Sequence, residues 1–126
     1  MQKYNIIVES HVKKHDDNNY LYIQAIIEFV GLKINWNRFD MNFEPIFNFL
    51  SQLEKNESCE LGINTNDNSV ISYQTNFKYC TTGFSIGRDE FTILLKINKE
   101  IIIDTIRKIC DEINKFKEKY PNSRTF

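Results

Sequence analysis

The hydrophobic pattern of this chain changes its period at Asn98. From Phe91 to Ile97, apolar residues occupy every second position, which is the spacing of one face of a β-strand. After Asn98, apolar residues recur at intervals of three and four, at Ile102, Ile106, Ile109, Ile113, Phe116 and Tyr120. These intervals place the side chains on one stripe of an α-helix. The sequence therefore predicts a strand that leads directly into a long helix, capped by Asn98, whose stripe packs against a sheet.

Two further strands are expected at the start of the chain. Residues 4–12 alternate in the same way, and the polar run Lys13–Asn19 is expected to be a hairpin loop. In the second strand, Tyr20–Val30, the odd positions are apolar and the even positions are mixed. This asymmetry predicts one buried face and one partly exposed face, as in an antiparallel sheet. Gly31 then breaks the pattern, and 33–39 is expected to be a shorter extended segment.

The middle of the chain predicts one helix and three more strands. Apolar residues at helical spacing extend to about Lys55, and they are Phe43, Ile46, Phe47, Leu50 and Leu53. Asp40 or Asn42 is the expected cap of this helix, and Pro45 falls in its first turn, where a missing N–H is tolerated. Strands are expected at 59–65, 70–77 and 79–86, with turns at 66–68 and 87–89.

This order of elements predicts an α+β fold. Short connections favour hairpins, so the strands are expected to form a largely antiparallel sheet of about six strands, in the order β-β-α-β-β-β-β-α. Both helices are expected on one face of that sheet, in a two-layer arrangement. Residues 1–126 are interpreted as a single domain, because the length is typical of one domain and no linker or repeat interrupts the chain.

Composition excludes several classes of function. The chain has 16 basic and 17 acidic residues, and this balance disfavours nucleic-acid binding, which requires a basic excess. No apolar stretch approaches the ~18 residues of a membrane span, and no signal peptide is expected at the N-terminus. Three widely spaced cysteines, Cys59, Cys80 and Cys110, indicate reduced thiols in a cytoplasmic protein, more typical of small buried apolar residues than of nucleophiles.

The residues that could carry catalysis or metal binding do not form a recognisable site. His11 and His15 are four residues apart, but they lie in a strand and a polar loop rather than on a helix, so a metal site is disfavoured. The chain has neither a phosphate-binding glycine loop nor a nucleophile motif, and we expect no enzyme activity, cofactor or metal. The cluster Trp36, Arg38 and Phe39 resembles an interface anchor, although a role in covering the sheet is the favoured interpretation.

Two groups of residues are candidates for contact with a protein partner. The first consists of acidic residues near the ends of predicted elements: Glu54, Glu57, Glu60, Asp67, Asp89 and Glu90. The second consists of side chains expected on the exposed face of the sheet: Tyr20, Tyr22 and Gln24, together with Tyr73 and Tyr79 if their strands face the same way. Tyrosines exposed on an uncovered sheet often mark a protein-binding face.

The predicted layout resembles bacterial immunity proteins of polymorphic-toxin and contact-dependent inhibition systems, in particular the wall-associated-protein (WapI-type) immunity family. The resemblance covers about residues 19–120. It rests on the helix pattern of Phe43, Ile46, Leu50 and Leu53, on Gly83 within Thr82–Ile86, and on the strand and helix of Phe91–Lys119.

The resemblance implies a small cytoplasmic protein that binds a cognate toxin C-terminal domain and occludes its active site or substrate entrance. It implies neither nucleic-acid nor membrane binding, and the chain would be a monomer or a weak dimer. If the toxin is a nuclease with a basic site, acidic residues of the inhibitor would speed the encounter. An alternative from another class is a small-molecule-binding domain or enzyme that uses a pocket between sheet and helices.

Overall fold

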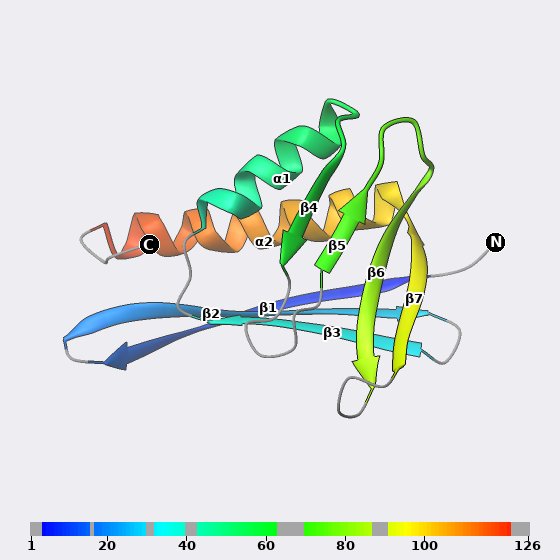
Figure 1. The fold of residues 1–126 in the computed structure, drawn as a ribbon. Coiled ribbons are helices and arrows are strands. Elements are labelled where there is room, and N and C mark those ends of the chain that lie inside the picture. The colour runs from blue at the N-terminus through cyan, green and yellow to red at the C-terminus, as the bar shows by residue number, and fades with distance from the viewer. Residues whose placement is uncertain are drawn as a thin grey trace.

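The computed structural model describes residues 4–15, 17–29, 32–39, 43–62, 70–86 and 91–121. These residues form seven strands and two helices (Figure 1). The strands are β1 (Asn5–His15), β2 (Asn18–Phe29), β3 (Leu32–Phe39), β4 (Cys59–Gly62), β5 (Val70–Tyr73), β6 (Tyr79–Ile86) and β7 (Phe91–Asn98). The helices are α1 (Glu44–Glu54) and α2 (Lys99–Lys119). The expected order of elements is confirmed, and the extended segment before α1 is a full strand, β3.

The strands belong to two antiparallel sheets. Sheet A has the order β1-β2-β3, and sheet B has the order β4-β5-β6-β7. All described neighbours are antiparallel, so the α+β class with antiparallel strands is confirmed. The strands form two sheets instead of the single sheet expected, because α1 separates β3 from β4 and each run of hairpins pairs only within itself. Both helices lie on the same side of sheet A (Figure 1).

The hairpin between β1 and β2 is tighter than expected. The pairing is continuous from Asn5 opposite Glu28 to His15 opposite Asn18, and Asp17 has a positive φ of 64° in the connection. The expected loop at Lys13–Asn19 is therefore wrong at both ends. Polar residues continue the strand here because the end of the hairpin extends into solvent, where a polar side chain costs little.

Helix α2 is the central element of the fold. It follows β7 directly, and the Asn98 side chain accepts a hydrogen bond from the Glu100 N–H at 2.8 Å, which confirms the expected cap. The stripe from Ile102 to Phe116 is buried, and Tyr120 is half-buried at the C-cap. Ile103, Thr105 and Cys110 are also buried and widen the apolar arc. This width lets α2 contact α1 and strands of both sheets.

Sheet A packs its inner face against α2. The odd positions of β2 are all buried, at Leu21, Ile23, Ala25 and Ile27, as the alternation predicts. One polar bond spans this layer, because the Ser10 hydroxyl donates to Glu112 Oε2 at 2.8 Å. Among the described residues, neither helix is both long and apolar enough to cross a membrane.

Helix α1 packs on α2 and β4. It starts after Phe43, which provides no side-chain cap, and Pro45 lies in its first turn as expected. The expected caps Asp40 and Asn42 lie outside the described residues. Ile46, Phe49 and Leu53 form the buried side of this helix.

Two buried threonines give a matched test of hydrogen bonding in this core. Thr82 is buried and its hydroxyl has no partner among the described residues, whereas the hydroxyl of buried Thr105 donates to the Ile101 carbonyl at 2.8 Å. We expect Thr82→Val to raise the free energy of unfolding by about 1 kcal/mol, because it removes an unsatisfied polar atom. Thr105→Val should give no such gain. Urea unfolding measures both, and equal effects of the two substitutions would contradict this reasoning.

Candidate partner-binding surface

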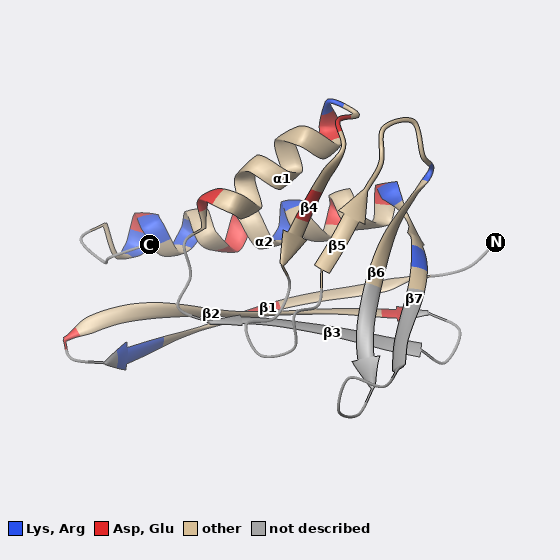
Figure 2. Ribbon diagram, in the orientation of Figure 1, with Lys and Arg blue, Asp and Glu red and all other residues tan. Residues whose placement is uncertain are grey.

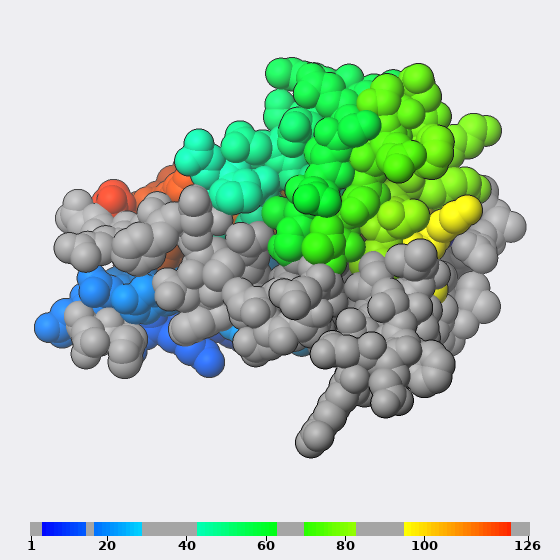
Figure 3. Space-filling view, viewed as in Figure 1, coloured from blue at the N-terminus to red at the C-terminus, as the bar shows by residue number. Residues whose placement is uncertain are grey.

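Two connections meet at one end of the molecule and form a surface that we call the tip. It consists of residues 55–58, between α1 and β4, and residues 74–79, which include the turn between β5 and β6. Figure 3 shows these two regions as one continuous surface at the top of the molecule. The tip also lies next to the start of α2, because the Lys99 N–H donates to the Lys78 carbonyl at 2.9 Å.

Side-chain hydrogen bonds join the two connections of the tip. The Asn56 amide donates to Asn76 Oδ1 at 2.9 Å, and the Asn76 N–H donates to Asn56 Oδ1 at 3.2 Å. Ser58 Oγ lies 3.0 Å from Thr75 Oγ1 and accepts from the Thr75 N–H at 3.0 Å. Asn56 and Asn76 have positive φ values of 61° and 71°, which asparagine tolerates better than most residues. These bonds tie together the two connections of the tip, which are distant from each other in the sequence.

Tyr73 belongs to the support of the tip and not to an exposed surface. Its side chain is buried, and its hydroxyl donates to Asn56 Oδ1. The ammonium group of Lys99 lies 4.5 Å from the centre of its ring, in cation–π geometry. The prediction that Tyr73 is exposed for toxin binding is therefore wrong. The physical reason is its position in β5, where it alternates with Ser72 and faces the core together with Ile71.

Two aromatic side chains are strongly exposed at the tip. Phe77 is 56% exposed and Tyr79 is 48% exposed, and Val12 is the other large apolar side chain in this state among the described residues. Phe77 ends a turn in which its N–H donates to the Gln74 carbonyl at 3.1 Å. Exposed aromatic side chains on a fixed backbone are typical anchors of protein interfaces, since they lose little conformational entropy on binding. Tyr79 was expected at such a surface, and its exposure is consistent with that role.

Charges of both signs occupy this end of the molecule, as Figure 2 shows. Glu57 is exposed at the tip, but so are Lys55 and Lys78. Glu54 accepts a hydrogen bond from the guanidinium of Arg107 at 2.9 Å, which links α1 to α2. The acidic candidates Glu54 and Glu57 therefore lie among basic side chains at this end of the molecule. Any charge complementarity with a partner has to be local.

The other acidic candidates are not gathered at the tip. Glu60 is exposed on β4, where it pairs with Ser72 across the outer side of sheet B, opposite to the buried Leu61. Asp67, Asp89 and Glu90 lie outside the described residues.

The face of sheet A that points away from α2 carries the remaining tyrosine candidates. Tyr20, Tyr22 and Gln24 are half-buried there, as the mixed even positions of β2 predict. The ring of Tyr22 stacks with His11 at a centroid distance of 6.4 Å, and Lys13 Nζ lies 5.3 Å from its centre. Among the described side chains no group of metal ligands gathers around His11 or elsewhere.

The three cysteines have the properties of residues that pack the core rather than those of nucleophiles. Burial raises the pKa of Cys80 to about 12 and the pKa of Cys110 to about 11, and it also raises the pKa of Cys59. These thiols are therefore protonated at neutral pH and are poor nucleophiles.

An open groove of about 420 Å³ lies between the edge of β1 and α2. Ile6, Ile7 and Val8 line one side, and α2 contributes charged side chains at Lys108, Asp111, Glu112 and Lys115. The groove lies at the border of sheet A. The small-molecule alternative instead expects a pocket in the layer between sheet and helix, where Ile27 and Ile113 are completely buried.

Phe77 is the main residue of the tip that sequence reasoning did not find. The alternation of β5 was expected to continue through Phe77, which would have placed this ring in the same row as Ile71 and Tyr73. The strand instead ends at Tyr73, and a turn follows. The available signal was the polar run Gln74–Asn76, since asparagine at the third position of a turn favours positive φ.

Comparisons with protein-family models, with curated proteins and with solved structures find no match to this chain.

Proposed function

We propose that this chain is an immunity protein that binds a cognate toxin domain and covers its active site or substrate entrance. The observation that supports this proposal best is the pair of exposed aromatic side chains, Phe77 and Tyr79, on a tip whose two connections are tied together by side-chain hydrogen bonds. The family resemblance in the order and apolar pattern of the elements supports a toxin domain as the partner.

A rigid tip suits an inhibitor because binding energy is not spent on ordering a loop. Phe77 and Tyr79 would fill apolar depressions near the active site of the toxin, and Glu57 would pair with a basic group beside them. A specific protein interface usually buries roughly 800 Å² per partner, so the contact would extend from the tip onto adjoining residues. The exposed charges of both signs favour a partner with a matching mixed pattern rather than a uniformly basic one.

The proposal places the protein in the cytoplasm, where it would meet the toxin after entry or during synthesis. Three cysteines without a disulfide support a reducing compartment, since free thiols persist there.

Co-expression with the toxin domain encoded next to this chain tests the proposal. We expect growth of a susceptible cell to be restored, and the purified proteins to form a stoichiometric complex with a Kd in the nanomolar range by isothermal titration calorimetry. A toxin domain from an unrelated system serves as the control and should remain toxic. Growth arrest despite full expression of both cognate partners would contradict the proposal.

A further inference from the structure

The free edge of sheet A is the feature that carries a further inference. β1 lies at the border of the sheet and pairs with β2 alone among the described strands. An edge strand presents backbone N–H and C=O groups away from its sheet, and natural proteins usually protect such edges with charged residues, especially lysine, with proline, with bulges or with short length. β1 has eleven residues, no proline and an uninterrupted pairing along its whole length, and its two lysines, Lys13 and Lys14, lie together near one end. It is therefore well suited to accept another strand.

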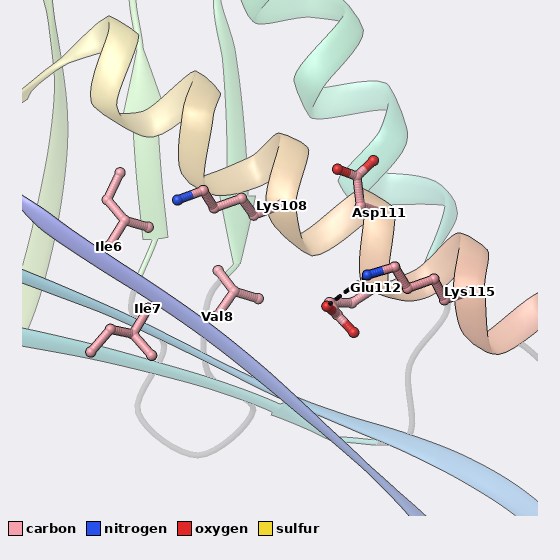
Figure 4. A pocket seen from close by; sticks show the side chains of 7 residues that line it. All are labelled: Ile6, Ile7, Val8, Lys108, Asp111, Glu112 and Lys115. Carbon is pink, nitrogen blue, oxygen red and sulfur yellow. Dashed lines mark ion pairs between the residues drawn. The ribbon is translucent and has the colours of Figure 1, made fainter.

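Open space follows part of this edge. Figure 4 shows the groove between β1 and α2, with Ile6 and Val8 on the strand side and Lys108, Glu112 and Lys115 on the helix side. Glu112 is already engaged with Lys115 at 3.6 Å and with Ser10 at 2.8 Å, so the helix wall beside the strand is ordered by its own contacts. The groove of about 420 Å³ leaves room for a few residues of an incoming strand.

We propose that the occupant is a second copy of this chain, paired antiparallel through β1 with the two Ser10 residues on the two-fold axis. Ser10 is the middle residue of Asn5–His15, so this register pairs the complete strand of one copy with the complete strand of the other. A two-fold axis perpendicular to the sheet also keeps both α2 helices on the same face. The product is one continuous sheet that contains all three strands of sheet A from both copies.

The side chains of β1 are self-complementary in this register. Glu9 of one copy lies opposite His11 of the second copy, and the two-fold symmetry generates the same pair a second time. Val12, which is 42% exposed in the single chain, lies opposite Val8 of the second copy. Within β1 no like charges are directly opposed, because Lys13 and Lys14 lie opposite Ile7 and Ile6 of the second copy. Glu112 approaches the axis beside Ser10 in each copy, where Lys115 of the same chain is its ion-pair partner. A shift of the axis to Glu9 would oppose two carboxylates within the strand itself. Cross-strand pairs of this kind contribute to sheet stability and fix its register.

Sedimentation analysis of the full chain with charge-reversed variants tests this proposal. The wild-type chain should show a concentration-dependent dimer. Glu9→Lys and His11→Glu, each alone, should weaken the dimer about tenfold. The first substitution places a lysine opposite His11, and the second places a glutamate opposite Glu9. By symmetry, each unfavourable pair occurs twice in the dimer. The double variant restores opposite charges across the axis and should return dimerisation to near the wild-type level. With the axis on His11 instead, position 9 would face Lys13, and the double variant would not recover.

Cysteine cross-linking gives an independent measurement of the register. Directly opposite residues in an antiparallel pair have Cα atoms about 4.5–5.5 Å apart, which suits a disulfide. Ser10→Cys should therefore form a covalent dimer under copper–phenanthroline oxidation. Val12→Cys is the matched control, since the two copies of this position would be separated by about 13 Å along the strands and should not cross-link above the wild-type background.

The outcomes separate clearly. A recovered double variant together with selective cross-linking at position 10 would establish the interface. A chain that stays monomeric at all concentrations, charge variants that do not alter the dimer, or equal cross-linking at positions 10 and 12 would overturn it. Circular dichroism of each variant verifies folding. The inference does not rest on the proposed function, because the test uses this chain alone.

Discussion

Replacing Ile113 with alanine is expected to lower the free energy of unfolding by about 2–5 kcal/mol. Ile113 is completely buried on α2, the helix that contacts both sheets and α1. Shortening its side chain removes apolar surface from the core and leaves a cavity that the surrounding strands cannot fully close, because they are held by their own ladders. Urea or thermal unfolding monitored by circular dichroism measures the loss.

Asn114→Ala is the matched control for this prediction. Asn114 is the next residue of the same helix and is exposed, so the substitution changes helix propensity but removes no packing. It should leave stability unchanged or raise it slightly. If Ile113→Ala unfolded no more easily than Asn114→Ala, α2 would not be the central packing element of this fold.

The sequence predicts α2 well but predicts its surroundings only in part. The change of period at Asn98 and the spacing from Ile102 to Phe116 correspond to the observed strand, cap and buried stripe. The sequence analysis identified only one apolar stripe on this helix and did not identify the second buried row, which includes Ile103 and Cys110. A single stripe implies one packing surface, whereas the observed wide arc supports two sheets. The width of an apolar arc is therefore the signal in this chain that indicated more than one layer.

Strand pairing was the least predictable part of the fold. Alternation identifies strands and their buried faces, as it does for β2, but it does not specify which edges meet after a long connection. The segment from Leu32 to Phe39 is the clearest example. Its sequence indicates an extended chain, and only the pairing with β2 makes it a strand of sheet A.

The sequence predicts the residues of the candidate surface only where the alternation within one strand determines which side chains are exposed. Tyr73 and Tyr79 were placed together as tyrosines of neighbouring strands, but Tyr73 faces the core and Tyr79 faces solvent. The deciding feature is the turn at Gln74–Phe77, which ends one strand and resets the alternation before the next. The bonds of Asn56 with Asn76 join residues 20 positions apart, and no local pattern in the sequence encodes such a contact.

Phe77→Ala and Tyr79→Ala are each expected to weaken toxin binding about 30-fold or more, which is the loss of at least about 2 kcal/mol typical of an aromatic anchor. About half of each side chain is exposed in the free protein, and neither is part of the buried core, so their removal should change the free energy of unfolding by less than about 0.5 kcal/mol. This combination distinguishes a binding role from a structural one. Calorimetric titration with the cognate toxin domain and a growth assay measure the effect, and unfolding in urea verifies stability.

Glu60→Ala and Lys96→Ala provide the controls, because they change the outer side of sheet B and not the tip. Both residues are exposed, and the strand register places them in one row with Ser72 and Thr81. If the tip is the contact surface, these variants should bind the toxin as the wild type does. If Glu60→Ala weakens binding while Phe77→Ala does not, the partner contacts sheet B, and the acidic residues rather than the aromatic anchors determine recognition. Wild-type affinity in all four variants would exclude both surfaces while leaving inhibition itself intact.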